Sequence, residues 1–159
     1  MTDQALGAVV RREVTVDAPI ERAFDVFTNQ MATWWPHDSH HVGAMPADAV
    51  MEPLAGGRCY SRAHDGTECD WGRVLRWEPP DRVVFAWLLT PRWEFEPDPA
   101  NASEVEVRFA AAGEGRTHVV LTHGGFERYA DGGDEMRRQV GEPGGWGILL
   151  ERFAAGVAA

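Results

Sequence analysis

The chain has 159 residues, of which 44% are hydrophobic and 25% are charged, as is typical of one globular domain with a single core. Its strong cations are scattered arginines and its formal net charge is −10, so a nucleic acid is not an expected partner. The apolar runs are too short to cross a membrane, and the N-terminus lacks the apolar stretch of a signal peptide. We therefore expect a single cytoplasmic domain over residues 1–159, with no nucleic-acid or membrane partner.

The first predicted elements are one strand and two short helices. Residues 8–17 are rich in β-branched side chains and predict a strand. Pro19 suits the first turn of a helix, and apolar residues follow it at helical spacing: Ile20, Ala23, Phe24 and Phe27. Residues 29–35 predict a second short helix, which Pro36 would end.

From about residue 48 the apolar pattern changes to a period of two, which predicts strands joined by hairpins in an antiparallel sheet. Asp65-Gly66 and Pro79-Pro80 mark two of the turns. A proline-rich excursion over 91–102 is either a lid or a guard of a sheet edge. The predicted strands are 48–53, 57–64, 68–78, 82–90, 104–112 and 117–123.

The end of the chain predicts a second helical region, which begins near Gly133 and is interrupted at 142–145. An apolar stripe at i, i+3, i+4 and i+7 then follows: Trp146, Leu149, Leu150 and Phe153. The apolar face of the sheet needs cover, and only this terminal helix is long enough to supply it. The prediction is an α+β fold in which a curved sheet of six or seven strands wraps around a long C-terminal helix.

Five segments, taken in order, resemble one family of proteins. They are PIERAFDVFT with TWWP, Gly56-Gly57-Arg58, GRVLRWEPPDRVVFAW, THVVLTHGGF and GWGILLERF. Together they resemble the SRPBCC (START/Bet v-like) superfamily, and more narrowly its activator of HSP-90 ATPase homologue branch. The resemblance implies a helix-grip fold whose cavity, between the sheet and the last helix, holds a hydrophobic or aromatic small molecule.

In such a fold, the seven tryptophans and seven phenylalanines would supply an apolar wall with few polar groups. His123 would lie at the rim of the cavity, where its ring contacts a ligand or caps a nearby carbonyl. Arg73 would need a carboxylate partner if it pointed inward, and an outward orientation is equally compatible with the sequence. The candidate ligand-binding residues are Trp35, Trp71, Arg73, Phe85, Trp87, Phe109, Leu121, His123, Trp146, Leu150 and Phe153.

Two further groups of reactive side chains carry weaker expectations. Cys59 and Cys69 flank a predicted hairpin turn and could face each other, but a cytosolic protein would keep them reduced. Four metal-ligand side chains crowd one loop without the spacing of a defined site: His37, Asp38, His40 and His41. We therefore expect neither a metal nor a cofactor.

Three functions are compatible with these residues. The leading hypothesis is a binding protein for a hydrophobic small molecule. The second is an enzyme like the polyketide cyclases and hydrolases of the superfamily, with Tyr60, Arg73 or His123 transferring a proton. The third is a co-chaperone or regulatory domain that contacts another protein, and a homodimer is also compatible with the sequence.

Overall fold

The computed structural model describes residues 9–35, 46–90, 92, 94–129 and 131–158. Its centre is a seven-stranded antiparallel sheet with the order β1-β7-β6-β5-β4-β3-β2. The predicted strands are therefore present, with bounds that differ by a few residues. They are β1 (Val10–Val16), β2 (Pro46–Met51), β3 (Arg58–Ala63), β4 (Glu68–Glu78), β5 (Arg82–Trp87), β6 (Ser103–Ala111) and β7 (Thr117–Gly124).

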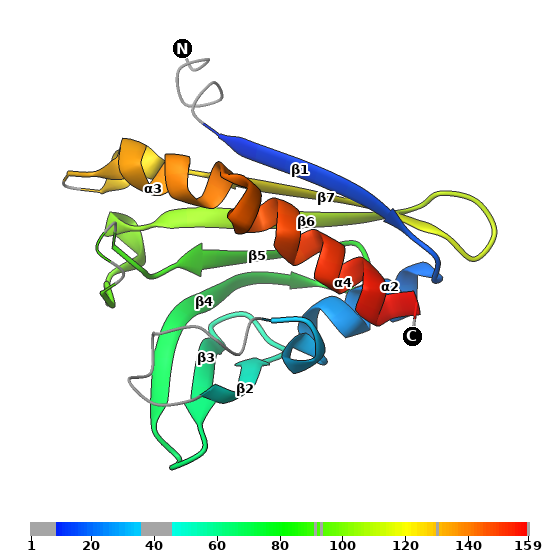
Figure 1. The fold of residues 1–159 in the computed structure, drawn as a ribbon, viewed down its shortest axis with the longest axis horizontal. Coiled ribbons are helices and arrows are strands. Elements are labelled where there is room, and N and C mark those ends of the chain that lie inside the picture. Colours follow the sequence, from blue (N-terminus) through cyan, green and yellow to red (C-terminus); the bar gives the residue numbers. More distant parts are fainter. Residues whose placement is uncertain (1–8, 36–45, 91, 93, 130, 159) are drawn as a thin grey trace.

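The sheet curls because β4 carries two irregularities. The first lies where Cys59 pairs with Gly72 and Tyr60 pairs with Asp70, which leaves Trp71 as an extra residue. The second lies between Val74 and Arg76 in the pairing with β5. Bulges of this kind bend a strand and increase its twist. Figure 1 shows the result, with β4 curving strongly and β2 and β3 turned away from the direction of β1, β7 and β6.

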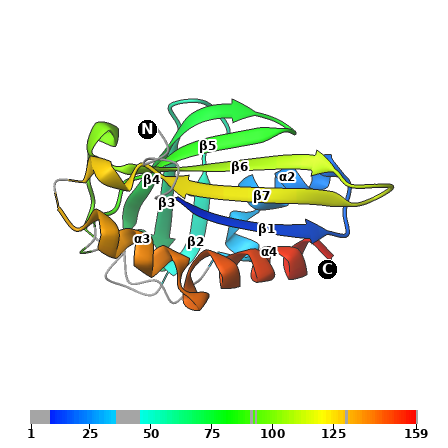
Figure 2. The same ribbon diagram turned by 90° about the horizontal axis from the view of Figure 1, so that it is seen from above.

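The helices lie at the two ends of the chain. Two short elements follow β1, namely α2 (Ile20–Thr28) and the single turn η1 (Met31–Thr33). The C-terminal helical region comprises α3 (Gly133–Gly141), the irregular turn η4 (Pro143–Gly147) and α4 (Ile148–Ala158), so the predicted interruption is present. In Figure 2, α3 and α4 run in sequence along one side of the sheet. None of the described helices is long and apolar enough to span a membrane.

The break between α3 and α4 has a local cause at Gly145. Its backbone is not helical, and a Cβ built on it would lie 2.1 Å from the carbonyl oxygen of Val140. Only glycine therefore permits this close approach. After the break, α4 lies against the inner face of the sheet, and the guanidinium of Arg22 in α2 donates to the carbonyl of Val157 near its end. This arrangement confirms the helix-grip fold.

The core lies between the inner face of the sheet, α2 and α4. Strand registers decide which residues reach it, because partners opposite each other in a sheet share a face. Val74, Phe85 and Val105 are paired across β4, β5 and β6 and all are fully buried. A second, small apolar cluster lies apart from this core and contains Ala86, Leu88 and Ala102, with Leu75 packed against it.

Candidate functional site

The residues predicted to line a cavity come together on the inner face, with the exception of Arg73. Each of them is at most 5% exposed. They are contributed by the segment after η1, by strands β4 to β7 and by the helical region at the C-terminus. These residues are Trp35, Trp71, Phe85, Trp87, Phe109, Leu121, His123, Trp146, Leu150 and Phe153.

The aromatic rings of this group pack against one another. Trp35 and Trp71 are stacked almost parallel, with ring centroids 4.6 Å apart and an interplanar angle of 9°. Trp87 and Trp146 meet edge to face at 5.5 Å, and Trp35 lies 6.4 Å from Trp87 and 6.3 Å from Trp146. The space between sheet and helix is thus occupied by four indole rings, with the parallel pair at its β4 side.

His123 lies inside this interior and not at a rim, because its side chain has no exposure to solvent. Its Nδ1 accepts a hydrogen bond from the indole N–H of Trp146 at 2.9 Å. Its Nε2 lies 2.7 Å from the hydroxyl of Ser103. The ring of Phe126 stacks on the imidazole, with ring centroids 4.7 Å apart.

Two further bonds extend this contact into a chain that ends on the backbone. The hydroxyl of Ser103 lies 2.9 Å from that of Tyr129, which donates to the carbonyl of Leu89 at 2.8 Å. An indole N–H only donates and a carbonyl only accepts, so the direction of every bond between them is determined. The His123 Nε2–H donates to Ser103, and the hydroxyl of Ser103 donates to Tyr129.

This chain requires a neutral imidazole at His123. Burial lowers the pKa of His123 to about 3, because the charged form would lose its hydration. A proton on Nδ1 would also oppose the indole N–H of Trp146, placing two donors against each other. Burial likewise raises the pKa of the Tyr129 hydroxyl. Neither ring nitrogen of His123 is therefore available as a base in this state.

Other buried polar atoms have no hydrogen-bond partner within the part of the chain that the structure describes. Three of them lie in the interior, namely the indole nitrogens of Trp35 and Trp71 and the hydroxyl of Ser61. Trp35 is 5% exposed, Trp71 is 0% exposed and Ser61 is 1% exposed. Unpartnered buried donors are rare in proteins, since each loses its bond to water without replacement. The interior thus has one satisfied polar chain and a separate set of unsatisfied donors.

Arg73 does not belong to the inner face, and its assignment to the ligand-binding wall is wrong. It pairs with Ala86, whose side chain belongs to the small second cluster, whereas its neighbours Gly72 and Val74 pair with the core residues Trp87 and Phe85. The reason is the bulge at Trp71, which shifts the alternation of β4 by one residue before Arg73 is reached. Arg73 points outward, and Trp71 and Arg73 do not share a face.

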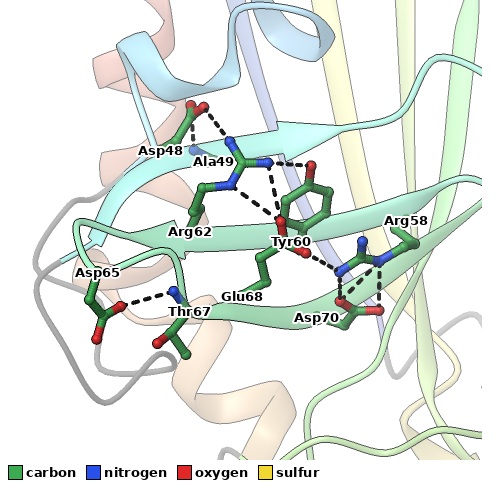
Figure 3. A network of polar contacts seen from close by, with 9 residues as sticks. All are labelled: Asp48, Ala49, Arg58, Tyr60, Arg62, Asp65, Thr67, Glu68 and Asp70. Carbon is green, nitrogen blue, oxygen red and sulfur yellow. Dashed lines mark hydrogen bonds and ion pairs between the residues drawn. The ribbon is translucent and has the colours of Figure 1, made fainter.

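Tyr60 also lies on the outer face, where it is the centre of a network of charged side chains (Figure 3). The guanidinium carbon of Arg58 lies 4.2 Å from the centre of its ring, and that of Arg62 lies 5.4 Å from it. Arg62 also donates to the Tyr60 hydroxyl at 3.0 Å. Carboxylates complete the network through ion pairs of 2.6 to 3.7 Å: Asp48, Glu68 and Asp70.

The cysteines do not face each other. Cys59 pairs with Gly72 and Cys69 pairs with Ser61, and both thiols are free. Burial raises the pKa of the Cys59 thiol, which keeps it protonated and unreactive. The histidine-rich segment with His37, Asp38, His40 and His41 lies outside the described residues. Among the described ones, no group of three or more metal-ligand side chains is brought together.

A hollow of about 520 Å³ opens at the end of the sheet, next to Tyr129. It shares Tyr129 with the hydrogen-bond chain of His123 and Ser103. Four of its nine lining residues carry carboxylates and one carries a guanidinium, so this hollow is more highly charged than the aromatic interior between the sheet and α4. Its lining residues are Thr90, Arg92, Glu94, Glu96, Asn101, Tyr129, Asp131, Gly132 and Glu135.

Sequence reasoning missed Ser61, Ser103 and Tyr129. A signal for the two serines was present, because each continues the alternation of an inner strand face. Ser103 precedes Val105 by two residues, and Ser61 follows Cys59 by two. Asking which polar residues occupy inner positions would have found both. Tyr129 follows the short turn η3 (Phe126–Arg128), where no periodic pattern exists.

A curled antiparallel sheet around a C-terminal helix, with an aromatic interior, defines a helix-grip domain of the SRPBCC type. The chain belongs to the Activator of Hsp90 ATPase homolog 1-like protein family, whose model matches residues 17–158. This match confirms the resemblance seen in the sequence. A comparison with proteins of curated function gives no match.

Several solved structures are similar to this chain over nearly their full length. An anthrahydroquino-γ-pyrone synthase, Txn09, complexed with SUM, is 40% identical, with a TM-score of 0.66 over 93% of this chain and 96% of that chain. CalC, a self-sacrificing resistance protein from Micromonospora echinospora, is 29% identical, with a TM-score of 0.60 over 94% and 93%. The protein MLL2253 from Mesorhizobium loti shares the fold at 22% identity, with a TM-score of 0.64 over 94% and 96%.

Proposed function

We propose that this chain binds a planar aromatic small molecule between the inner face of the sheet and α4, stacked on the ring of Trp71. The observation that carries the proposal is the parallel pair of Trp35 and Trp71 in a buried, apolar interior. The other ring contacts of Trp71, with Phe85 and Trp87, are edge-on or tilted. One face of Trp71 is thus already covered by a flat ring, and a flat guest of similar thickness fits in its place.

In this proposal, the guest displaces the ring of Trp35 from the face of Trp71. Trp35 follows the short turn η1 and belongs to no helix or strand. Its indole N–H is buried without a partner among the described residues, so moving the ring into water restores a hydrogen bond. The indole N–H of Trp146, by contrast, is bonded to His123. Displacing Trp35 therefore costs less than displacing Trp146.

The similarity to the synthase supports an aromatic guest. By its name, that protein is a synthase of an anthrahydroquino-γ-pyrone, and it is 40% identical to this chain. We therefore choose xanthone as the probe, because it is a planar γ-pyrone fused to two benzene rings. It reacts with neither thiols nor mild reductants, which keeps Cys59 and Cys69 out of the measurement.

The experiment is a calorimetric titration of the protein with xanthone. We expect one site per chain, and Trp71→Leu should weaken binding by about tenfold or more through the lost stacking surface. Trp35→Ala should bind as well as the unchanged protein or more tightly, because the place of the guest is already vacant. Trp77→Leu is the control, since Trp77 contacts Phe24 edge-on at 5.1 Å, away from the parallel pair.

Two results would contradict the proposal. One is that the unchanged protein takes up no xanthone. The other is that a folded Trp71→Leu variant binds it with unchanged affinity. If Trp71→Leu does not fold, the affinity of Trp35→Ala for xanthone decides between the alternatives. Removing Trp35 would weaken binding if its ring were a fixed part of the wall, but not if the guest displaces it.

A second candidate function is closure of a ring in the bound molecule, which the 40% identity to a synthase favours. Neither His123, with both nitrogens bonded, nor Cys59, with its raised pKa, would serve as a base. The chain would act by holding a reactant folded in a dry interior.

An o-hydroxyaryl 1,3-diketone closes to a γ-pyrone with loss of water, and mass spectrometry follows that loss. The rate should rise with the unchanged protein and with Tyr60→Phe, but not with Trp71→Leu; equal rates in all samples would exclude this activity.

A further inference from the structure

We infer that the hydroxyl of Ser61 selects ligands that present a carbonyl oxygen to the β3–β4 side of the interior, over hydrocarbons of the same shape. This inference rests on the proposed binding function and adds the chemical class of the guest. Neither the family match nor the similar structures assign a role to the hydroxyl of Ser61, which has no partner among the described residues.

The strand registers place Ser61 beside the proposed stacking platform. Ser61 lies opposite Ala49 of β2 and Cys69 of β4, and all three share the inner face. Trp71 is two residues further along β4 than Cys69, at the bulge. Ser61 and Trp71 are therefore diagonal neighbours, a separation that an aromatic side chain such as that of Trp71 can span. A planar molecule on Trp71 presents its edge to this part of the sheet.

Among the described residues, the side chains around Ser61 offer its hydroxyl no strong hydrogen-bond partner. The residue is 1% exposed, and no partner exists for the oxygen among the described residues. Ala49 has no polar side-chain atom, and a thiol such as that of Cys69 is a weak donor and acceptor. The neighbouring indole N–H of Trp71 is also unpartnered. This corner of the interior thus holds two unsatisfied donors, which favour a guest that carries acceptor oxygens.

Ser103 provides the contrast that makes the inference testable. It is also a buried serine on the inner face, but its hydroxyl is bonded to both His123 and Tyr129. Replacing a satisfied hydroxyl strands its partners, whereas replacing an unsatisfied one removes a penalty. Ser103→Ala should therefore lower the stability of the ligand-free protein, and Ser61→Ala should leave it unchanged or raise it.

The binding test uses xanthone and xanthene, which share one skeleton and differ in the carbonyl group. The unchanged protein should bind xanthone about tenfold more tightly than xanthene, the worth of one buried hydrogen bond. Ser61→Ala should remove that difference by weakening xanthone alone. Both affinities are measured by calorimetry, and denaturant unfolding of ligand-free Ser61→Ala and Ser103→Ala gives the second, ligand-independent readout.

The possible failures are distinguishable. If the unchanged protein binds neither probe, the proposed function falls and this inference falls with it. If it binds both equally, with Ser61→Ala unchanged, the selection by Ser61 is wrong while the binding function stands. If ligand-free Ser61→Ala loses as much stability as Ser103→Ala, the hydroxyl already has a partner such as an ordered water, and the inference is overturned.

Discussion

The two faces of the sheet hold their polar groups in different ways. On the outer face, Tyr60 lies between Arg58 and Arg62, in a network whose charged side chains are 24% to 42% exposed. On the inner face, His123 and Ser103 belong to a single chain of bonds with no exposure at either residue. Each arginine of the outer network has two carboxylate partners and is partly exposed to water, whereas the groups of the inner chain are bonded only to buried neighbours.

This difference separates polar groups that serve the fold from those that are open to a ligand. Water replaces any partner lost from the outer network, so its individual ion pairs contribute little. Inside, a lost partner leaves a stranded group. The His123 chain is complete and therefore structural, whereas the equally buried hydroxyl of Ser61 has no partner among the described residues. We expect a ligand to bind where a buried polar group lacks a hydrogen-bond partner, and not where every buried polar group already has one.

The largest effect should come from breaking the inner chain at His123. His123→Leu keeps the volume of the side chain but strands the indole N–H of Trp146 and a bond of Ser103. We expect the free energy of unfolding to fall by about 2–4 kcal/mol, from two stranded groups. Urea unfolding of the variant measures this loss. Stability equal to that of the unchanged protein would mean that the chain contributes nothing.

The next effect is a dependence of stability on pH. The pKa of His123 is about 3 in the folded protein and 6.5 in an unfolded chain. Between these values the unfolded state binds more protons, so stability falls as the pH falls, by about 1.4 kcal/mol per pH unit at full slope. The full stability is present above the unfolded value. Unfolding curves between about pH 5 and pH 7 measure the slope. This pH range lies above the range in which carboxylates titrate.

His123→Gln provides the control for this slope, because it keeps a polar side chain and removes the titrating group. The slope should disappear in the variant. A slope of the same size in His123→Gln would assign the pH dependence to another group and would contradict the neutral, buried imidazole.

The smallest effect should come from the outer face. Arg58→Gln removes a guanidinium from beside Tyr60 and its pairs with Asp70 and Glu68. We expect a loss of stability far smaller than that of His123→Leu, and one that disappears in about 1 M salt, where charges are screened over a few ångströms. Xanthone affinity should not change. A loss as large as that of His123→Leu would remove the distinction between the two faces.

Most of the fold could be predicted from the sequence because it rests on local periodicity. The alternation over β6 and β7 and the helical stripe of Leu150 and Phe153 are visible without coordinates. The faces of β4 could not be predicted, because a bulge depends on pairing with neighbouring strands. An unbroken alternation groups Trp71 with Arg73, and the bulge at Trp71 places them on opposite faces.

The candidate site was predictable in its apolar part only. Large aromatic residues at inner positions of the strands predict an apolar interior surface, and those residues are buried together. Whether a polar side chain inside finds a partner depends on residues distant in sequence, as with Ser103 and Tyr129, which are 26 positions apart. The sequence therefore could not distinguish the satisfied Ser103 from the unsatisfied Ser61.

The most direct test of a ligand stacked on Trp71 is an NMR study of the protein saturated with xanthone. We predict nuclear Overhauser contacts between xanthone and the Trp71 ring, and faster exchange of the Trp35 indole hydrogen with water. The indole hydrogens of Trp34 and Trp146, which are bonded to Val26 and His123, should remain slow and serve as internal references. Contacts from xanthone to surface residues alone, with Trp35 still protected, would contradict a site in the interior.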